Sequence, residues 1–339
     1  MDMVSFFGAG LIAFTLCVFF IVMAKPLARH IGLVDKPVGR KQHEGAIPLI
    51  GGLVIIPVYL GVLFFFPDYH DLPLLKFVPA TLTLLAVGAL DDRMHIRPWV
   101  RFGIQVVVAL YSVIIFENLN SNLGNLFGFG NVGLGWFKYI FFATCLVLLM
   151  NAINMIDGVD GLSGGLLTVV TLFLIAVVGV KSNLFFPLFL LICCLLAFLV
   201  FNMRHPLRKK ASVFIGDAGS LSLALLIGWL AIEASNNKLI EPISIAWSLA
   251  VPIIDTFALF FIRVKNGVSP FQGDRLHLHY KLIDHGLPPG MVAFTLIVMG
   301  TVAGAIGYAA TMSSLPTFIF FYSWAGLLLG YTFYRLKRG

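Results

Sequence analysis

Five aspartates in three short polar segments are the residues of this sequence best suited to chemistry. The pair Asp91-Asp92 ends one apolar stretch, and the run Asp157-Gly-Val-Asp160-Gly places two carboxylates three residues apart, each before a glycine. The third segment places Asp217 at a predicted helix start. Hard cations such as Mg²⁺ take carboxylate oxygens, together with waters or substrate phosphates. Since the chain carries only sixteen acidic residues, this clustering indicates a site for a metal ion and a phosphate.

A further polar segment, Asp274-Arg-Leu-His-Leu-His279, adds two imidazoles and a guanidinium. For Asp157 or Asp217 taken alone, helix capping would be the default interpretation, because an aspartate in a first turn binds free backbone amides. Capping does not explain five aspartates together with an H-x-H pair and several arginines. A site for a diphosphate and a metal ion explains this combination better, and helix starts with free amides would add to anion binding.

The composition places these segments in a membrane protein. Hydrophobic residues make up 59% of the 339 residues, charged residues 12%, and the mean hydropathy is +0.97. A helix needs about 20 residues to cross a hydrocarbon core, and backbone polar groups in lipid must be paired within the segment. The stretch 188–201 is apolar on every face, without the alternation of a β-barrel strand. The predicted fold class is therefore all-α, a polytopic integral membrane protein.

Eleven transmembrane helices are predicted, and ten is the alternative count because two of the segments are short. The short segments are 75–90 and 164–180. The predicted spans are 3–24, 47–66, 75–90, 100–116, 136–155, 164–180, 185–202, 218–236, 243–262, 291–312 and 316–334.

Charge asymmetry predicts the orientation of these helices. Nineteen of the 23 Lys and Arg residues fall on one side of the predicted path. The positive-inside rule places that side in the cytoplasm, with the N-terminus outside and the C-terminus cytoplasmic. The chain is predicted to form one domain, 1–339, whose active-site face consists of the cytoplasmic loops 25–46, 91–99, 156–163, 203–217 and 263–290.

Other classes of site and partner are not indicated. All four cysteines lie in apolar spans without metal-binding spacing, so neither disulfides nor zinc are expected. The net charge of +7 is divided among membrane-flanking loops, where it suits contact with membrane lipids, and no nucleic-acid-binding motif accompanies it. A homodimer is compatible with the sequence but no segment specifies one.

One carboxylate, Asp255, lies inside a predicted span, where it is expected to be paired or functional. Structural and functional roles are equally consistent with its position. The rival function is a transporter or flippase for a phosphorylated lipid or sugar. Transporters place ionisable residues near the bilayer midplane on broken helices, whereas this chain keeps most of its acids in loops.

Five ordered blocks resemble the polyprenyl-phosphate N-acetylhexosamine-1-phosphate transferases, and the resemblance covers nearly the whole chain. The last block is closer to the WecA and TagO branch than to MraY. Tyr280 stands where that branch usually has a third histidine, so no third-histidine role is carried over. The blocks are Gly39 to His43 running on to Pro48 to Gly52, Asp91 to Arg93, Asn151 to Gly165, Val213 to Ser220, and Asp274 to Leu282.

The resemblance implies transfer of a sugar 1-phosphate from a UDP-N-acetylhexosamine to a polyprenyl phosphate, in a multi-pass protein of the bacterial inner membrane with a cytoplasmic active site. GlcNAc and undecaprenyl phosphate are the expected substrates, and Mg²⁺ the expected cofactor, with Mn²⁺ as the alternative. The implied metal ligands are Asp217, Asp157 and Asp160, and the implied catalytic residues are Asp91, Asp92, His277 and His279. The implied substrate-binding residues are Asn154, Asp157, Asp160, Arg275, Arg40, Lys41 and His43.

Two mechanisms remain open at this point. In the favoured one, the lipid phosphate attacks the sugar-linked phosphorus directly. In the other, an aspartate first forms a covalent phosphosugar intermediate. The sequence also leaves open the identity of the hexosamine and the glycan pathway served, whether O antigen, common antigen or teichoic acid.

Overall fold

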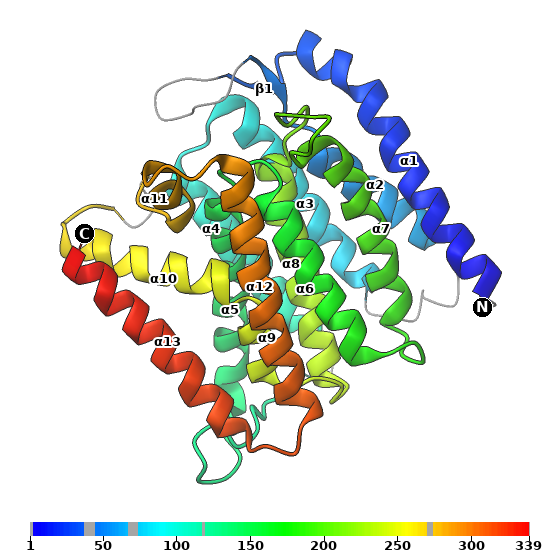
Figure 1. Ribbon diagram of the computed structural model, residues 1–339. Helices are drawn as coiled ribbons and strands as arrows, with labels where there is room; N and C mark the ends of the chain where they lie inside the picture. Colours follow the sequence, from blue (N-terminus) through cyan, green and yellow to red (C-terminus); the bar gives the residue numbers. More distant parts are fainter. Residues whose placement is uncertain (1–2, 37–44, 67–73, 117–118, 270–273, 339) are drawn as a thin grey trace.

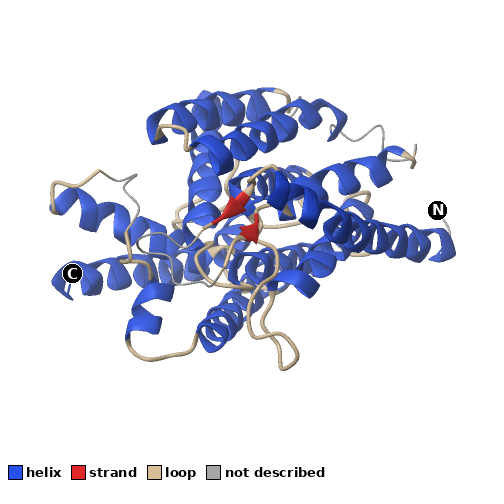
Figure 2. Cartoon of the chain, turned by 90° about the horizontal axis from the view of Figure 1, so that it is seen from above, coloured by secondary structure: helices blue, strands red, loops and turns tan. Residues whose placement is uncertain are grey.

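The computed structural model describes residues 3–36, 45–66, 74–116, 119–269 and 274–338, and these form a helical bundle (Figure 1). A two-stranded antiparallel ribbon of β1 (Val34–Asp35) and β2 (Ile47–Pro48) lies at the upper end of the bundle, near the middle of the view in Figure 2. The helices are α1 (Met3–His30), α2 (Gly51–Phe64), α3 (Leu74–Met94), α4 (Pro98–Ile114), α5 (Lys138–Ile156), α6 (Leu162–Val178), α7 (Phe185–Asn202), α8 (Gly216–Asn236), α9 (Pro242–Ser248), α10 (Ala250–Lys265), α11 (Leu278–Asp284), α12 (Pro289–Met312) and α13 (Thr317–Arg338).

The all-α membrane fold is confirmed, and each predicted span coincides with helix in the structure. The span 243–262 is broken, however, into α9 and α10, which meet at 79°. Pro252 follows the break by three residues, and because it lacks an N–H and crowds the carbonyl four residues earlier, a straight helix is disfavoured there. By length and hydropathy, five helices of the described chain suit a membrane crossing, or six with the bent pair. The number eleven and its orientation stay predictions.

Helix α8 is the centre of the bundle. Every residue from Ala218 to Ile232 is buried, and α2, α3, α5 and α6 pack around this helix (Figure 1). Near its far end the Trp229 ring is stacked between Phe77 and Phe116, with centroid distances of 5.1 and 5.6 Å. A helix that is apolar on all sides must be enclosed by other helices. Because its neighbours hold α8 in place, its polar first turn has a defined position.

The first turn of α8 is held against the start of α2 by backbone contact. A Cβ atom on Gly52 would lie 2.0 Å from the Cα of Gly219, so neither position accommodates a side chain without a backbone shift. The segment before α8 also pairs with the segment before α2, because Gly51 and Gly52 donate from their N–H groups to the carbonyls of Phe214 and Ile215 at 2.9 Å. Two sequence blocks that are far apart along the chain are thus joined.

Substitution of Gly52 by alanine is predicted to destabilise the protein by about 1–3 kcal/mol, because the added methyl group forces α2 and α8 apart. Gly61 is the matched control: it lies on the exposed side of α2, and a Cβ there meets nothing within 4 Å. Thermal unfolding in detergent should show a lower midpoint for G52A and an unchanged or higher midpoint for G61A, since alanine is the better helix former. Equal midpoints for the two variants would contradict the close helix contact.

Candidate active site at the start of α8

One guanidinium joins two of the predicted carboxylates. Nη1 of Arg101, in the first turn of α4, lies 2.5 Å from Oδ2 of Asp91 and 2.7 Å from Oδ2 of Asp217. Asp91 also accepts a hydrogen bond from the backbone N–H of Ile96 at 2.7 Å. The ends of α3, α4 and α8 therefore meet around Arg101. From the sequence alone, Arg101 was assigned only a topological role, although it stands ten positions after Asp91 at the start of the next helix.

Asn154, near the end of α5, lies where the resemblance implied a site residue. Its Nδ2 donates to Oδ1 of Asp217 at 2.6 Å and to Oγ of Ser220 at 3.0 Å. Asp217 thus has one carboxylate oxygen on Asn154 and the other on Arg101. Because these two partners come from different helices, the orientation of the Asp217 carboxylate is fixed by the packing of α5 on α8 and of α4 on α5.

Asp92 caps the start of α8. Its Oδ1 accepts from the backbone N–H of Asp217 at 2.9 Å, and its Oδ2 accepts from that of Ala218 at 3.3 Å. The capping expected of Asp217 is therefore supplied by a residue of another helix. The same contact means that these two amides bind Asp92, not an external anion, which limits the anion-binding role predicted for this helix start.

The two aspartates of the 157–160 segment differ in their partners. Asp157 ends α5 and accepts a hydrogen bond from the hydroxyl of Ser163. Burial raises the pKa of Asp157 to about 7, and the charges of Asp217 and Asp160 add to the rise. Asp160 is buried, and its Oδ2 accepts from Nε of Arg204 at 2.8 Å and from the N–H of Ala211 at 2.9 Å. Through these contacts, Asp160 holds the 157–160 segment against the residues that precede α8.

His279, in the first turn of α11, reaches the same segment. It is fully buried, and among the described residues neither of its ring nitrogens has a hydrogen-bond partner. A Cβ atom on Gly158 would lie 2.4 Å from Nε2 of His279, so this contact requires glycine. Burial lowers the pKa of His279 to about 3, with the neighbouring His277 contributing, and the imidazole is therefore neutral at physiological pH.

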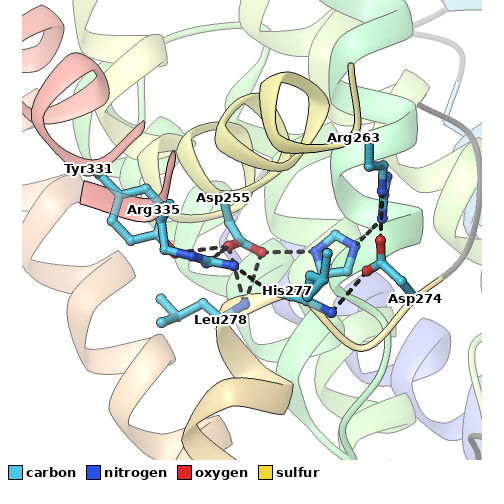
Figure 3. A network of polar contacts seen from close by, with 8 residues as sticks. Asp255, Arg263, Asp274, His277, Leu278, Tyr331 and Arg335 are labelled. Atoms are coloured by element: carbon cyan, nitrogen blue, oxygen red, sulfur yellow. Dashed lines mark hydrogen bonds and ion pairs between the residues drawn. The ribbon is translucent and has the colours of Figure 1, made fainter. Parts of the chain in front are cut away.

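His277 has a different environment, shown in Figure 3. Its Nδ1 lies 2.9 Å from Oδ2 of Asp255, and its Nε2 lies 3.5 Å from Nη2 of Arg263. Arg275 points to the surface of α11, where it pairs with Asp284 at 2.9 Å and covers the Tyr280 ring. The three predicted residues of this block thus lie in three environments, and His279 is the one that lies against Gly158 of the 157–160 segment.

Arg40, Lys41 and His43 lie outside the described residues, so their predicted contacts with substrate are not placed. No group of three or more His, Cys, Asp or Glu side chains in the described ranges is arranged to hold a metal ion by itself. The structure thus brings Asp91, Asp92, Asn154 and Asp217 together at one end of the bundle. The catalytic, substrate-binding and metal-binding roles of the predicted residues remain predictions.

The raised pKa of Asp157 generates a prediction about stability and pH. The folded state holds the Asp157 proton up to a pH of about 7, whereas the ordinary value is 3.8. Between these values, rising pH therefore costs the folded state stability, and the cost is complete above pH 7. In metal-free buffer, Asp157→Asn should stabilise the protein by about 1–3 kcal/mol at pH 8, and by clearly less at pH 5.

The measurement is the unfolding midpoint of both proteins at the two pH values. Asp284→Asn makes the same chemical change at an exposed ion pair and should give no comparable pH-dependent gain. A gain for D157N that is equal at pH 5 and pH 8 would contradict a raised pKa of this half-buried carboxylate.

Comparison with known proteins identifies the family of this chain. Residues 74–235 match the model of glycosyl transferase family 4. Proteins named undecaprenyl-phosphate alpha-N-acetylglucosaminyl 1-phosphate transferase are similar over most of their length. The protein from Salmonella typhi is 34% identical over 87% of this chain and 81% of its own. Those from Escherichia coli O157:H7 and Yersinia pestis are 33% and 32% identical, over 93% and 94% of this chain and 88% and 89% of their own.

These relatives confirm the family resemblance drawn from the five sequence blocks, and they lend no support to a transporter. The matched region includes the cluster around Arg101 and the 157–160 segment. The chain belongs to glycosyl transferase family 4.

Proposed function

We propose that the protein transfers GlcNAc-1-phosphate from UDP-GlcNAc to undecaprenyl phosphate, giving undecaprenyl-diphosphate-GlcNAc and UMP. The relatives carry the name of this activity. The observation that carries the proposal is the cluster of Asp91, Asp217, Asn154 and Arg101, assembled from four helices at one end of an apolar bundle. A lipid substrate and a water-soluble nucleotide sugar meet only at such a membrane surface.

The reaction brings two highly charged groups together, the diphosphate of the sugar donor and the phosphate of the lipid. We propose Mg²⁺ as the cofactor, with Asp217 and Asp157 as its ligands from the protein. Mg²⁺ is usually held by one or two carboxylates, with substrate phosphates and waters as remaining ligands. The hard oxygen donors at this site and the raised pKa of Asp157 suit such a cation. When bound, it offsets negative charge on the diphosphate.

Asp160 is less suited to the metal than the sequence predicted, since its side chain is only 8% exposed and its Oδ2 binds Arg204 and the backbone of Ala211. The side chain of Asp217, the other predicted ligand, is 30% exposed and is preorganised. Asn154 holds Oδ1 and Arg101 holds Oδ2, so the carboxylate has a defined position before substrate arrives. Preorganised charges are the main source of catalysis in phosphoryl transfer.

The buried His279, beside the exposed Gly158, supplies an uncharged contact for the substrate. A neutral imidazole offers one donor and one acceptor, and both nitrogens of His279 are without partners among the described side chains. A substrate oxygen or amide at this position would satisfy a nitrogen that is otherwise buried without a hydrogen bond, which is an unfavourable state. We propose that His279 binds the donor substrate.

Direct attack remains the favoured mechanism. An oxygen of the lipid phosphate forms a bond to the sugar-linked phosphorus while the bond from that phosphorus to the UMP oxygen breaks. A phosphate monoester has a second pKa of about 6, so near neutral pH most of the lipid phosphate is already a dianion. Asp91 is hydrogen-bonded to Arg101 and Ile96, and Asp92 to the amides that start α8. Both carboxylates are thus engaged, which disfavours a nucleophilic role.

The surroundings of the enzyme follow from the same proposal. Its membrane is the bacterial inner membrane, and the cation-rich side with the active site faces the cytoplasm. The product is the first lipid-linked intermediate of a cell-envelope glycan.

The purified protein should release UMP and place label in the lipid fraction when incubated with labelled UDP-GlcNAc, Mg²⁺ and undecaprenyl phosphate. Asp217→Asn should reduce this turnover at least 10²-fold, the usual order for loss of one preorganised electrostatic group, while the unfolding midpoint stays close to that of the wild type. Asp284→Asn, at an exposed ion pair, should retain full activity. Near-normal turnover of D217N would remove Asp217 from the site, and an inactive wild type would overturn the function.

Direct attack also predicts the outcome of an isotope-exchange experiment. Without a lipid acceptor, labelled UMP should not exchange into UDP-GlcNAc, because the sugar phosphate is never held by the protein alone. A covalent aspartyl intermediate would release UMP before the lipid binds and would therefore permit exchange. Exchange that requires the protein but no lipid would overturn direct attack.

A further inference from the structure

Asp255 has an unusual set of partners for a carboxylate inside a membrane helix. The residue is buried in α10, and each of its oxygens accepts from a side chain of another segment: Oδ2 lies 2.9 Å from Nδ1 of His277, and Oδ1 accepts from the hydroxyl of Tyr331 at 3.0 Å. The backbone N–H of Leu278 lies 3.2 Å from Oδ1. A buried carboxylate is stable only when its charge is paired and its lone pairs are satisfied, and this one is held by α13 on one side and by the H-x-H segment on the other.

The last helix also contacts that segment directly. Arg335 of α13 is buried, and its Nη2 donates to the backbone carbonyl of Leu276 at 2.5 Å. Its Nη1 donates to the Tyr331 hydroxyl at 2.6 Å and lies 3.5 Å from Oδ1 of Asp255 (Figure 3). Tyr331, Arg335 and Asp255 thus form one polar cluster that fastens the segment before α11 to the C-terminal helix.

This cluster selects one tautomer of His277. Nε2 faces Nη2 of Arg263, and a guanidinium can only donate, so Nε2 must be the acceptor. Nδ1 therefore carries the proton and donates it to Asp255. Arg263 is itself held in place by Asp274, whose Oδ2 accepts from Nε at 2.8 Å. Asp255 and Arg263 therefore favour the same tautomer of His277, with the proton on Nδ1, and both ring nitrogens have a partner.

We propose that Asp255, Tyr331 and Arg335 are positioning residues of the transferase site, and that they act through His277 to place His279. The inference rests on the function proposed above. The rings of His277 and His279 are nearly parallel, with centroids 5.5 Å apart, so a shift of the first ring is passed to the second. His279 in turn contacts Gly158 beside Asp157. His277 is a positioning residue as well, because its nitrogens serve the protein and not the substrate.

Asp255→Asn tests the tautomer without changing the size of the side chain. Tyr331 and Arg335 donate toward Oδ1, so the amide oxygen must stay there, whereas the N–H of Leu278 lies 3.2 Å from Oδ1 and 3.3 Å from Oδ2 and favours neither. The amide nitrogen then takes the place of Oδ2 and donates to Nδ1 of His277. The imidazole proton is forced onto Nε2, where it opposes the donor of Arg263. The same reversal of tautomer is known to disable a catalytic histidine when its aspartate partner becomes asparagine.

Two measurements separate positioning from mere stability. The ¹⁵N shifts of the histidine ring nitrogens, assigned with His277→Gln, report which nitrogen carries the proton. The KM for UDP-GlcNAc reports the placement of His279, because an inactive fraction lowers the apparent kcat but leaves KM unchanged. Tyr331→Phe serves as a second variant that removes one hydroxyl. Tyr322→Phe is its control, because Tyr322 is an exposed tyrosine of α13 whose hydroxyl donates to the carbonyl of Phe127.

D255N is expected to move the His277 proton to Nε2 and to lower kcat/KM about 10²-fold with a raised KM, the order of effect for a displaced binding group. Y331F is expected to raise KM about threefold to tenfold, with Y322F equal to the wild type. Retention of the Nδ1 proton in D255N would overturn the inference. If D255N does not fold, a KM of Y331F equal to that of Y322F overturns it. A wild type without transferase activity would overturn the proposed function instead, and the ¹⁵N measurement would still decide the role of the cluster.

Discussion

The site depends on the attraction between one guanidinium and two carboxylates at the first turn of a fully enclosed helix. Asp91 and Asp217 carry like charges that would repel each other in a poorly solvated place, and Arg101 lies between them. Asn154 and the amides that bind Asp92 add neutral donors around the same point. The bundle thereby holds several negative charges close together, and such an arrangement favours the arrival of a cation.

The apolar packing and the polar site are two aspects of one arrangement. Because α8 is surrounded on all sides, its first turn has a single position. The direct backbone contact between Gly52 and Gly219 defines that position. Of the helices that enclose α8, α3 and α5 end where it begins and supply Asp91 and Asn154, and α4, which packs on both of them, begins there and supplies Arg101. A cluster that draws on four helices is therefore as rigid as the core beneath it.

Sequence reasoning found the fold class and the helices, because apolar length is a local signal. It also singled out Asp91, Asp92, Asn154 and Asp217, which the structure brings together, while their roles stay predictions. Arg101 was missed because a cation beside a membrane helix is more often a topology signal. The break at Leu249 was missed although Pro252 signals it. The partners of Asp255 could not be found at all: Tyr331 and Arg335 lie 76 and 80 residues away along the chain. Only the packing of α13 on α10 brings them together.

The two polar clusters differ in how far their hydrogen-bonding capacity is used. Around Asp255 the cations and donors match the acceptors, so the cluster is complete without a ligand and suits a structural support. Around Asp157 and His279 the match is incomplete: a carboxylate is poorly solvated and lies near other carboxylates, and an imidazole is buried without a hydrogen bond among the described residues. Such groups are costly for a folded protein unless something else satisfies them. Under the proposed function, a charged substrate and a cation would supply the missing partners of Asp157 and His279, and the satisfied cluster around Asp255 would support that site from behind.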